Sequence, residues 1–237
     1  IALAPACRRA WLPPPKVYAE TWIPAHVRTP PGSEYDGVLS YDVAPHTRAV
    51  FRAWDDDDVR EIYLCWGTRN MKTTTAIALA IFASLHAPRP AAFGSANEEL
   101  VDRTFDEQFY PMMERCDATA HLVPPEGKRP RRAIKFERCR VRKAFGGSIA
   151  SVSGYPAAYL FASEWNKWQR KKSKEASPRS AFRQRMKGYP FVSKFLAEST
   201  PSDLDDSELD IWAMLHAPQT DHRTWQVPCP HCERYQS

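Results

Sequence analysis

Gly67-Thr68-Arg69-Asn70-Met71-Lys72-Thr73 is the stretch of sequence that decides the fold. Residues 61–66 before it form a mostly apolar run, short enough for one buried strand. Residues 74–83 after it are rich in alanine and larger aliphatic residues, a composition typical of a helix. A strand, a polar turn and a helix in this order cradle phosphate, because backbone N–H groups and the helix N-terminus face the anion.

The last two residues of this stretch carry the chemistry of the pattern. In the Gly-x-x-x-x-Gly-Lys-Ser/Thr motif the lysine reaches the terminal phosphates and the hydroxyl binds Mg²⁺. Lys72 and Thr73 stand at these two positions, whereas Trp66 and Met71 occupy the two glycine positions. A Lys-Thr pair after a strand also occurs in ordinary surface turns. The prediction of a phosphate-binding loop therefore depends on the rest of the chain.

The composition is that of a globular, soluble protein. The 237 residues, 43% hydrophobic and 26% charged, suit one sizeable α/β domain with appendages. The longest apolar stretch, around residues 76–83, is too short to span a bilayer, and we expect no membrane partner. No secretory signal is visible, so the six cysteines are expected to be reduced thiols. Because the chain begins at Ile1, we expect it to be part of something longer.

Positive charge is concentrated in two short regions. Residues 128–143 hold nine Lys or Arg against one acid, and residues 167–174 add five more. Such clusters suit a polyanion, although a solvated face explains any one of them as well. Residues 134–136 and 141–145 alternate like a two-stranded ribbon. The cations expected to reach a DNA backbone from this ribbon are Lys135, Arg138, Arg140 and Arg142.

The N-terminal part is marked by proline. Residues 1–44 include Pro13-Pro14-Pro15 and Pro30-Pro31, so we expect an extended arm around the domain and no core element. A short helix is predicted at residues 45–54. The four aspartates at 55–58 then make an acidic turn, which is either a cation site or, more simply, a solvated loop.

Two later strands end in polar residues. Residues 159–162 read as a buried strand that ends in Ser163 and Glu164. A carboxylate at this end of a strand lies near the nucleotide in such folds and can polarise an attacking water. Alone, Glu164 is an ordinary strand-end residue; with the phosphate loop it is the leading catalytic candidate. A further strand at 191–197 is closed by residues 198–201, where Ser199 and Thr200 either cap the backbone or sense the γ-phosphate. A strand is also predicted at 149–152.

Residues 227–232 form half of a zinc knuckle. Cys229 and Cys232 have the Cys-x-x-Cys spacing that supplies two of four tetrahedral ligands, and His231 between them is an unlikely third ligand. No second cysteine pair follows before Ser237. We therefore predict a site that would be completed only in a longer chain.

The order of these motifs resembles the large subunit of a tailed-phage DNA-packaging terminase of the lambda type. The similarity runs from about residue 17 to the C-terminus. It is carried by five segments: residues 67–73 as a deviant Walker A, Ala96 with 105–111, 159–164 as Walker B, 198–201 as the coupling motif, and 227–232 as the Cys-Pro-His-Cys stretch before a nuclease domain.

The resemblance implies an ATPase motor domain that moves double-stranded DNA into an empty procapsid in the host cytoplasm. Its implied partners are copies of itself in a ring, the small terminase subunit and the portal. Its implied cofactors are ATP and Mg²⁺, with Zn²⁺ in the longer protein. Residues 67–73 would bind the nucleotide. Within the site, Lys72 would bind the β/γ-phosphates, Thr73 and Ser163 would hold Mg²⁺, Glu164 would activate water, Arg69 would stabilise transferred charge, and Ser199 and Thr200 would couple phosphate state to DNA grip.

Two departures from the family pattern keep other functions open. The family has Gly where Met71 stands, and an Asp-Glu pair where Ser163 and Glu164 stand. Met71 puts a side chain where backbone must approach phosphate, and Ser163 removes a carboxylate that would help to hold Mg²⁺. A helicase-like ATPase is the alternative enzyme. A degenerate domain that binds DNA or a partner without hydrolysis is the alternative outside enzymes.

These observations together predict an α/β fold of the P-loop NTPase type, with a mainly parallel sheet flanked by helices. Three regions are expected: a proline-rich arm at 1–44, the ATPase domain at 45–217, and a linker with the start of a zinc-ribbon-like or nuclease region at 218–237.

Overall fold

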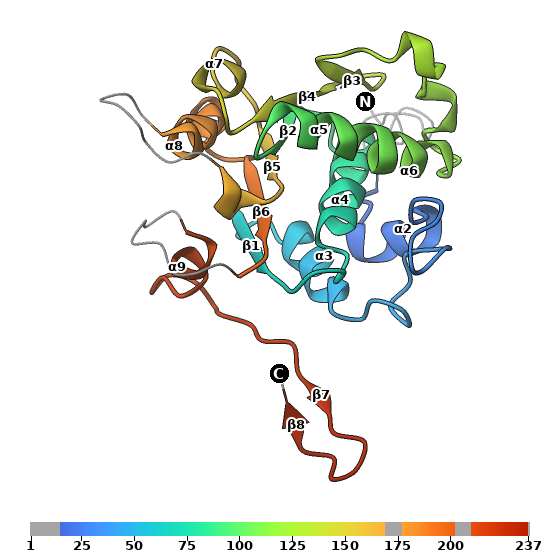
Figure 1. The fold of residues 1–237 in the computed structure, drawn as a ribbon, viewed down its shortest axis with the longest axis vertical. Coiled ribbons are helices and arrows are strands. Elements are labelled where there is room, and N and C mark those ends of the chain that lie inside the picture. The colour runs from blue at the N-terminus through green and yellow to red at the C-terminus, as the bar shows by residue number, and fades with distance from the viewer. Residues whose placement is uncertain (1–14, 169–176, 202–209, 237) are drawn as a thin grey trace, which may run out of the picture.

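A six-stranded sheet forms the centre of the molecule (Figure 1). The structure is a computed structural model that describes residues 15–168, 177–201 and 210–236. The strand order is β1-β6-β5-β2-β4-β3. The strands are β1 (Glu61–Cys65), β2 (Ala91–Ser95), β3 (Ala133–Lys135), β4 (Arg140–Phe145), β5 (Tyr159–Ala162) and β6 (Lys194–Ser199).

Every pairing except one in this sheet is parallel. The exception is the edge strand β3, which pairs antiparallel to β4, so the predicted two-stranded ribbon is present. Parallel neighbours require crossover connections, which the helices provide. Because the other five strands run the same way, their carboxyl ends share one edge of the sheet. The fold is therefore the predicted α/β arrangement with a mainly parallel sheet.

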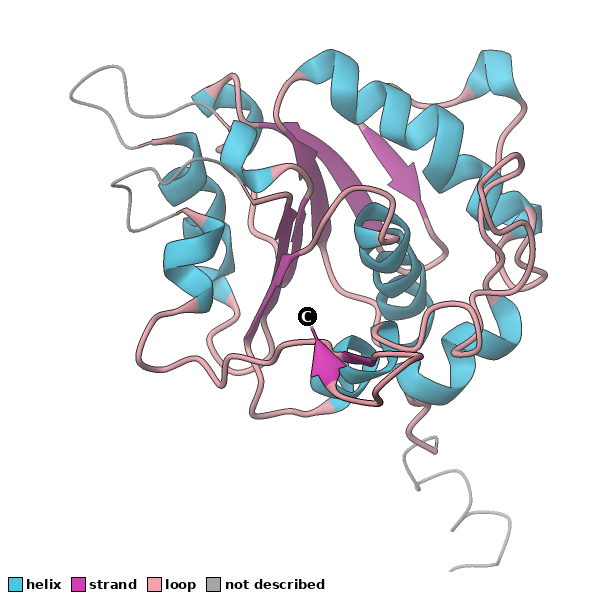
Figure 2. Cartoon of the chain, turned by 60° about the horizontal axis from the view of Figure 1, so that its bottom comes forward, coloured by secondary structure: helices cyan, strands magenta, loops and turns pink. Residues whose placement is uncertain are grey.

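Helices cover both faces of the sheet (Figure 2). One face packs against α2 (Ala19–His26), α3 (Thr47–Asp55), α4 (Lys72–His86), a π-helical turn η1 (Phe105–Phe109) and α6 (Tyr110–Glu114). The other packs against α7 (Ile149–Val152), the 3₁₀ turn η4 (Trp165–Lys167), α8 (Pro178–Arg183) and α9 (Ile211–Leu215). Near the ends of β2 and β4 lies α5 (Glu98–Thr104), and further 3₁₀ turns are η2 (Ala120–Leu122), η3 (Glu126–Lys128) and η5 (Gln184–Gly188).

Alternate side chains of strand β5 pack on opposite faces of the sheet. Tyr159 and Phe161 join the core beside α4, whereas Leu160 and Ala162 join the core beside α8. All four residues are buried because both faces are covered, and this explains the continuous apolar run. No helix in the described part of the chain is long and apolar enough to cross a membrane; the longest, α4, has 15 residues.

The N-terminal region differs from the extended arm that proline content predicted. Helix α2 lies within it, and Ala19, Ile23 and Val27 are fully buried in the main core. The ring of Trp22 lies 5.8 Å from that of Phe82 on α4, centroid to centroid. The prediction of no core element is wrong because the paired prolines flank residues 16–29 and leave only Pro24 inside the helix. The domain boundary at residue 44 stays a prediction.

Residues 149–152 are also a correction, since they form helix α7 where a strand was predicted. The Ser151 hydroxyl accepts a hydrogen bond from the Phe145 N–H, 2.9 Å away, and so ties this turn to the end of β4. Four residues are too few for hydrophobic periodicity to separate a helix from a strand.

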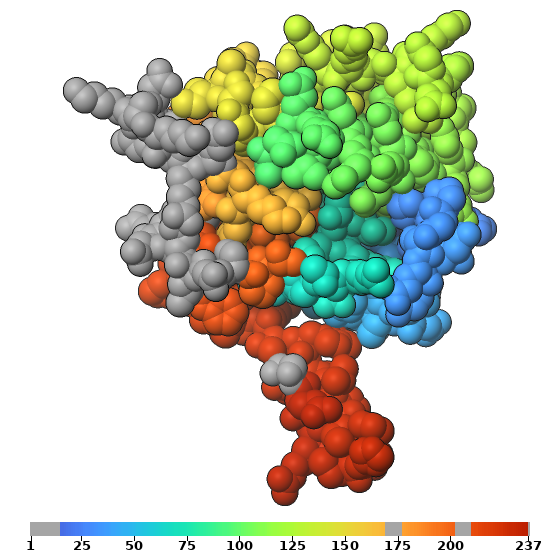
Figure 3. All heavy atoms as spheres, in the orientation of Figure 1, coloured from blue at the N-terminus to red at the C-terminus, as the bar shows by residue number. Residues whose placement is uncertain are grey.

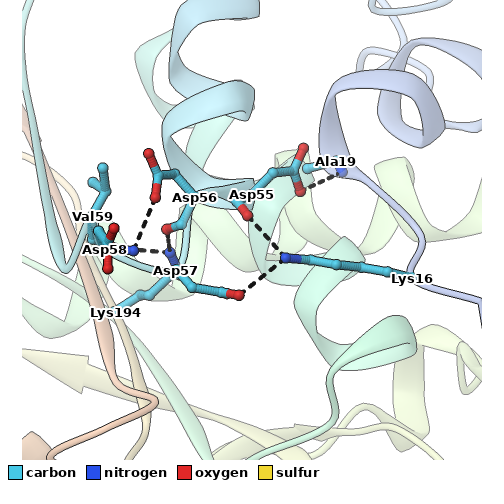
Figure 4. Close-up of polar contacts among 8 residues, drawn as sticks. All are labelled: Lys16, Ala19, Asp55, Asp56, Asp57, Asp58, Val59 and Lys194. Carbon is cyan, nitrogen blue, oxygen red and sulfur yellow. Dashed lines mark hydrogen bonds and ion pairs between the residues drawn. The ribbon is translucent and has the colours of Figure 1, made fainter. Parts of the chain in front are cut away.

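The acidic turn at residues 55–58 clamps three parts of the chain together (Figure 4). The Asp55 carboxylate accepts hydrogen bonds from the N–H groups of Ala19 and Glu20 at the start of α2, at 2.7 and 3.0 Å. Lys16 Nζ lies 3.2 Å from a carboxylate oxygen of Asp57. Lys194 Nζ of β6 donates to the main-chain oxygens of Asp56 in the turn and of Val59 just after it. The acidic run is therefore structural, and neither of its two predicted uses describes it fully.

The C-terminal end of the chain forms a small hairpin of β7 (Val227–Pro228) and β8 (Tyr235–Gln236). It projects away from the sheet domain, as the red segment of Figure 3 shows. All of its paired residues are exposed.

Candidate nucleotide site

The predicted phosphate loop joins β1 to α4 at the carboxyl edge of the sheet. We use this name for residues 66–71, which follow Cys65 and end where Lys72 begins α4. Gly67, Thr68, Arg69 and Asn70 are exposed. The loop is therefore exposed at the N-terminus of a 15-residue helix, a place that favours a bound anion.

Two residues of the phosphate loop have left-handed backbone conformations. Arg69 has φ 61° and Met71 has φ 55°. The second is the motif position at which glycine is expected, and a left-handed non-glycine residue costs roughly 1–2 kcal/mol. The Met71 side chain is partly buried and packs against the core beside α4. Met71 therefore adopts the left-handed backbone conformation that glycine adopts more easily.

Lys72 is directed back over the phosphate loop. Its side chain is buried, and Nζ donates to the main-chain oxygen of Gly67 at 2.8 Å. Gly67 itself is closely approached, because a Cβ there would lie 3.3 Å from the Asn70 side-chain nitrogen. The ammonium group is therefore held inside the curve of the loop.

A cavity of about 680 Å³ opens over the phosphate loop. In Figure 3 the teal surface of the loop faces the viewer between the blue N-terminal region and the orange segment after β5. Four parts of the chain line the cavity: the loop and α4 (Thr68, Arg69, Met71, Lys72, Thr73, Thr74), the N-terminal region (Thr29, Gly32, Ser33, Glu34, Tyr35), Gln108 of η1, and Glu164. Sequence reasoning did not find the N-terminal wall, since its residues carry no motif.

Glu164 is brought to this cavity by the end of β5. It has a left-handed backbone with φ 53°, and its carboxylate lies 2.7 Å from Lys167 Nζ. Backbone strain of this kind costs about 1–3 kcal/mol and concentrates at functional sites. The structure therefore places Glu164, Lys72 and Thr73 around one cavity, although they are some 90 residues apart in sequence.

Ser163 lies one residue earlier and points elsewhere. It is buried, and its hydroxyl donates to Oε1 of Glu198 at 2.5 Å. Its main-chain oxygen accepts from the indole N–H of Trp168 at 3.0 Å. Trp168 is packed so closely that a Cβ on Gly94 would lie 2.7 Å from its ring. The end of β5 is thus held firmly, with the Ser163 hydroxyl directed at β6.

Glu198 is the residue that sequence reasoning passed over. It is fully buried, and its Oε1 also accepts a hydrogen bond from the Thr73 hydroxyl at 2.8 Å. Among the described residues, its Oε2 has no hydrogen-bond partner. Burial raises the pKa of this carboxyl, and the hydrogen bonds from Ser163 and Thr73 act in the opposite direction. The available signal was an acidic residue at the end of a buried strand. The sequence analysis assigned a role only to the hydroxyl residues of this segment, Ser199 and Thr200.

Comparison with known proteins agrees with this arrangement. Residues 33–237 match the family model for the phage terminase large subunit gpA, ATPase domain. The chain belongs to this family. A sequence comparison with curated proteins found no match.

The fold of this terminase family member is also similar to solved structures. The crystal structure of the HK97 bacteriophage large terminase matches with a TM-score of 0.61 at 12% identity, over 84% of this chain and 40% of that one. The present chain thus spans about two fifths of that protein. A variant of the large terminase ATPase domain of Thermus phage P74-26 matches with a TM-score of 0.48 at 15% identity, over 70% of each chain.

The predicted coupling residues of this terminase domain lie at the end of β6. The Ser199 hydroxyl accepts from the Asn166 N–H at 3.3 Å, and its main-chain oxygen accepts from the Trp66 N–H at 3.2 Å. Ser199 therefore links η4 to the phosphate loop. Neither Ser199 nor Thr200 is among the described residues that line the cavity. Their predicted role as γ-phosphate sensors stays a prediction.

The basic segment divides into two groups. Arg129 and Lys143 are paired with acids, at 2.7 Å from Glu114 and 2.7 Å from Asp102. The four predicted DNA contacts, in contrast, are exposed: Lys135, Arg138, Arg140 and Arg142. Lys135 and Arg140 are opposite each other in the β3–β4 pair. They lie at the amino end of β4, away from the cavity. The second basic cluster falls largely on residues 169–174, outside the described part of the chain.

The cysteine pair of this family member lies in the β7–β8 hairpin. The N–H groups of His231 and Cys232 are directed at the Cys229 sulfur and lower the pKa of its thiol. All five cysteines in the described residues are free thiols. In the same residues, no group of three or more His, Cys, Asp or Glu could hold a metal ion.

Proposed function

We propose that this domain hydrolyses ATP and that hydrolysis drives double-stranded DNA into the procapsid. Membership of the terminase ATPase-domain family supports this proposal. The single observation that carries it is the convergence of Lys72, Thr73 and Glu164 on one cavity of about 680 Å³. These are a cation for phosphate, a hydroxyl for Mg²⁺ and a carboxylate for water, which phosphoryl transfer requires together.

The residues around the cavity fit a nucleotide with its metal. The exposed residues 67–70 would offer their N–H groups to phosphate oxygens, and Thr73 lines the cavity. Mg²⁺ takes oxygen ligands, commonly one or two carboxylates together with substrate phosphates, so an all-protein cluster is not needed. Bound Mg²⁺ would neutralise charge on the phosphates. The metal would be held by Thr73, with Ser163 and Glu198 behind it.

Each residue then has a defined task. Lys72 leaves the Gly67 oxygen and binds the β/γ-phosphates. Glu164 orients water and accepts its proton, and for this it must leave Lys167, 2.7 Å away. Exposed Arg69 stabilises the charge that develops on the transferred phosphoryl group. Ser199 and Thr200 transmit the phosphate state, through the link from Ser199 to η4, toward the DNA-gripping surface.

That surface is the proposed DNA contact formed by Lys135, Arg138, Arg140 and Arg142. Its charges are exposed, and contacts with phosphate carry no sequence information, as a motor on any DNA requires. The proposed partners are further copies in a ring, the small terminase subunit and the portal, in the host cytoplasm. A helicase-like ATPase would use the same cavity on another nucleic acid.

A domain that binds without hydrolysis is the second candidate. The ion pair between Glu164 and Lys167 favours it, because a paired carboxylate is a poorer base. The strained Met71 backbone is compatible with either function.

The proposed ATPase is tested by comparing Glu164→Gln and Lys72→Ala with the wild type, with DNA and partner subunits present. Glu164→Gln should keep ATP binding and lower turnover by roughly 10²–10⁴-fold. Lys72→Ala should weaken both. Glu114→Gln, on α6 and paired with Arg129, is the matched control and should change neither. Wild-type turnover no higher than that of Glu164→Gln would reject hydrolysis and favour the binding domain.

We further propose that Cys229 and Cys232 are half of a zinc site. The supporting observation is the turn whose N–H groups stabilise a thiolate at Cys229. Two thiolates leave two tetrahedral positions open, so this chain alone should bind zinc weakly and a longer chain tightly. Metal analysis of both, with Cys229→Ser as the control, decides the matter. A longer chain that binds no zinc would contradict the proposal.

A further inference from the structure

Strands β5 and β6 bring Ser163 and Glu198 side by side. The two strands are parallel neighbours, with Ala162 opposite Ala197, so the next residues of each strand are at the same level. Glu198 Oε1 accepts a hydrogen bond from the Ser163 hydroxyl at 2.5 Å and from the Thr73 hydroxyl at 2.8 Å. One buried oxygen thus joins β5, β6 and the first turn of α4.

These bonds determine which part of the Thr73 hydroxyl is available to a cation. A hydroxyl has one hydrogen to donate and two lone pairs. The Thr73 hydrogen is directed at Glu198, so its lone pairs remain for a metal ion. A carboxylate behind a metal ligand orients that ligand and increases its basicity, and loss of such a partner lowers metal affinity by about 10–100-fold.

Among the described residues, the Glu198 carboxyl takes part in no ion pair. The positive charge of Lys72 lowers the pKa of this carboxyl, but its ammonium group donates a hydrogen bond to the Gly67 oxygen and not to Glu198. Its Oε2 is buried without a hydrogen-bond partner. A buried carboxylate needs a charged or hydrogen-bonding partner, because burial removes its hydration. A cation bound at Thr73 would supply the charge partner that this buried carboxyl lacks.

We propose that Glu198 is the positioning carboxylate of a divalent-cation site, supplied by β6 where β5 has only the Ser163 hydroxyl. It acts on the cation through Thr73, and it makes the affinity for nucleotide depend on Mg²⁺. This inference rests on the proposed nucleotide site. Asp210, the other buried acid at this edge, already caps α9 through the Trp212 N–H at 2.8 Å and does not contact Thr73.

The test is a titration with a fluorescent ATP analogue in EDTA and in Mg²⁺. In the wild type, Mg²⁺ should increase the affinity. In Glu198→Gln, affinity in EDTA should stay within about twofold, since no phosphate contact is lost, while the increase with Mg²⁺ should fall by about 10–100-fold. Glu61→Gln, an acid at the opposite end of the sheet, is the control and should behave as the wild type.

A second variant moves the carboxylate to the neighbouring strand. Ser163→Asp combined with Glu198→Ser keeps the charge and the level in the sheet, so it should recover most of the Mg²⁺-dependent increase. This recovery distinguishes a role in metal binding from a role in packing. The swap also carries the test if Glu198→Gln does not fold, as thermal unfolding would show.

The outcomes separate this inference from the function on which it rests. No nucleotide binding by the wild type in either buffer would reject the proposed nucleotide site. Nucleotide binding with a Mg²⁺-dependent increase that Glu198→Gln retains would overturn the role of Glu198. Equal weakening in EDTA and Mg²⁺ would overturn it too, because the carboxylate would then support the loop alone. A folded Ser163→Asp, Glu198→Ser variant that shows no Mg²⁺-dependent increase in nucleotide affinity would also overturn the role of Glu198.

Discussion

The two ends of strand β6 each bury a charged side chain, and they do so in opposite ways. At the amino end, Lys194 is 8% exposed and its ammonium donates to the main-chain oxygens of Asp56 and Val59, at 2.6 and 2.8 Å (Figure 4). At the carboxyl end, Glu198 is 0% exposed; within the described part of the chain, one of its oxygens has two donors and the other has none.

The difference separates a charged group whose partners lie within the fold from one that we propose to act on a ligand. The Lys194 end fixes the acidic turn, which in turn holds the start of α2 through Asp55. Its partners are all within the fold. The Glu198 end is incomplete within the fold and lies beside the residues proposed to meet the nucleotide. We expect substitutions at the amino end to change stability and substitutions at the carboxyl end to change ligand binding.

The largest expected effect on stability comes from Lys194→Met. The methionine keeps packing near Trp54 but removes the side-chain donor from two part-buried carbonyl groups. The Asp56 oxygen still accepts from the Val59 N–H, so the main loss is at the Val59 oxygen, and one such unsatisfied group costs about 1–3 kcal/mol. We expect a loss of roughly 2 kcal/mol in the free energy of unfolding, measured by urea denaturation at pH 7. A loss smaller than that caused by Glu198→Gln would break the comparison.

The same residue should give stability a defined pH dependence. Burial lowers the pKa of Lys194 to about 8 in the folded protein, below the value of about 10.4 for an unfolded chain. Between these values the unfolded state binds more protons, so wild-type stability should rise with pH relative to Lys194→Met. The expected gain is about 2 kcal/mol between pH 7.5 and pH 10, measured by urea denaturation of both proteins at these two pH values. A constant difference would show that the ammonium is not desolvated.

A smaller effect is expected from Asp55→Ala. Asp55 accepts from two N–H groups at the start of α2, and loss of a helix cap costs about 1 kcal/mol, with a range of about 0.5–2. Asp58→Ala is the matched control, because the exposed Asp58 takes part through its backbone N–H and not through its carboxylate. We expect the midpoint temperature of thermal unfolding to be lower for Asp55→Ala than for the wild type and unchanged for Asp58→Ala. Equal shifts would mean that α2 is held by packing alone.

The smallest expected change in stability belongs to Glu198→Gln. The glutamine oxygen can still accept from Thr73 and Ser163, and the variant removes a buried charge without a partner. We expect the free energy of unfolding to change by less than about 1 kcal/mol. A loss of several kcal/mol in the same urea experiment would place Glu198 with Lys194, as a structural charge.

Local sequence was enough to predict part of this site. Lys72 and Thr73 follow a strand and begin a helix, and Glu164 ends a later strand; such junctions can be recognised one at a time. Because parallel strands place their carboxyl ends at one edge, convergence of these residues followed from the fold class. The mainly parallel sheet and the β3–β4 ribbon followed from apolar runs and alternation.

What local sequence could not supply is the order of the strands. Glu198 meets Ser163, 35 residues away, and Thr73, 125 residues away, only because β6 lies between β1 and β5. Ser163 was therefore seen as the loss of a carboxylate, while the carboxylate beside it went unnoticed. The N-terminal wall of the cavity was missed for a similar reason, since tertiary contacts with α4 determine its position.

Met71 shows that the left-handed backbone expected of a glycine at this position can be formed by another residue type. A search written in residue types rejects this chain at position 71, whereas a search written in φ values accepts it, with 55° at the place where glycine is customary. The same holds in design: a phosphate loop can be built without its second glycine if packing of the substituted side chain compensates for roughly 1–2 kcal/mol of backbone strain. If the proposed nucleotide site binds ATP, collections of such loops assembled by motif alone omit members of this kind.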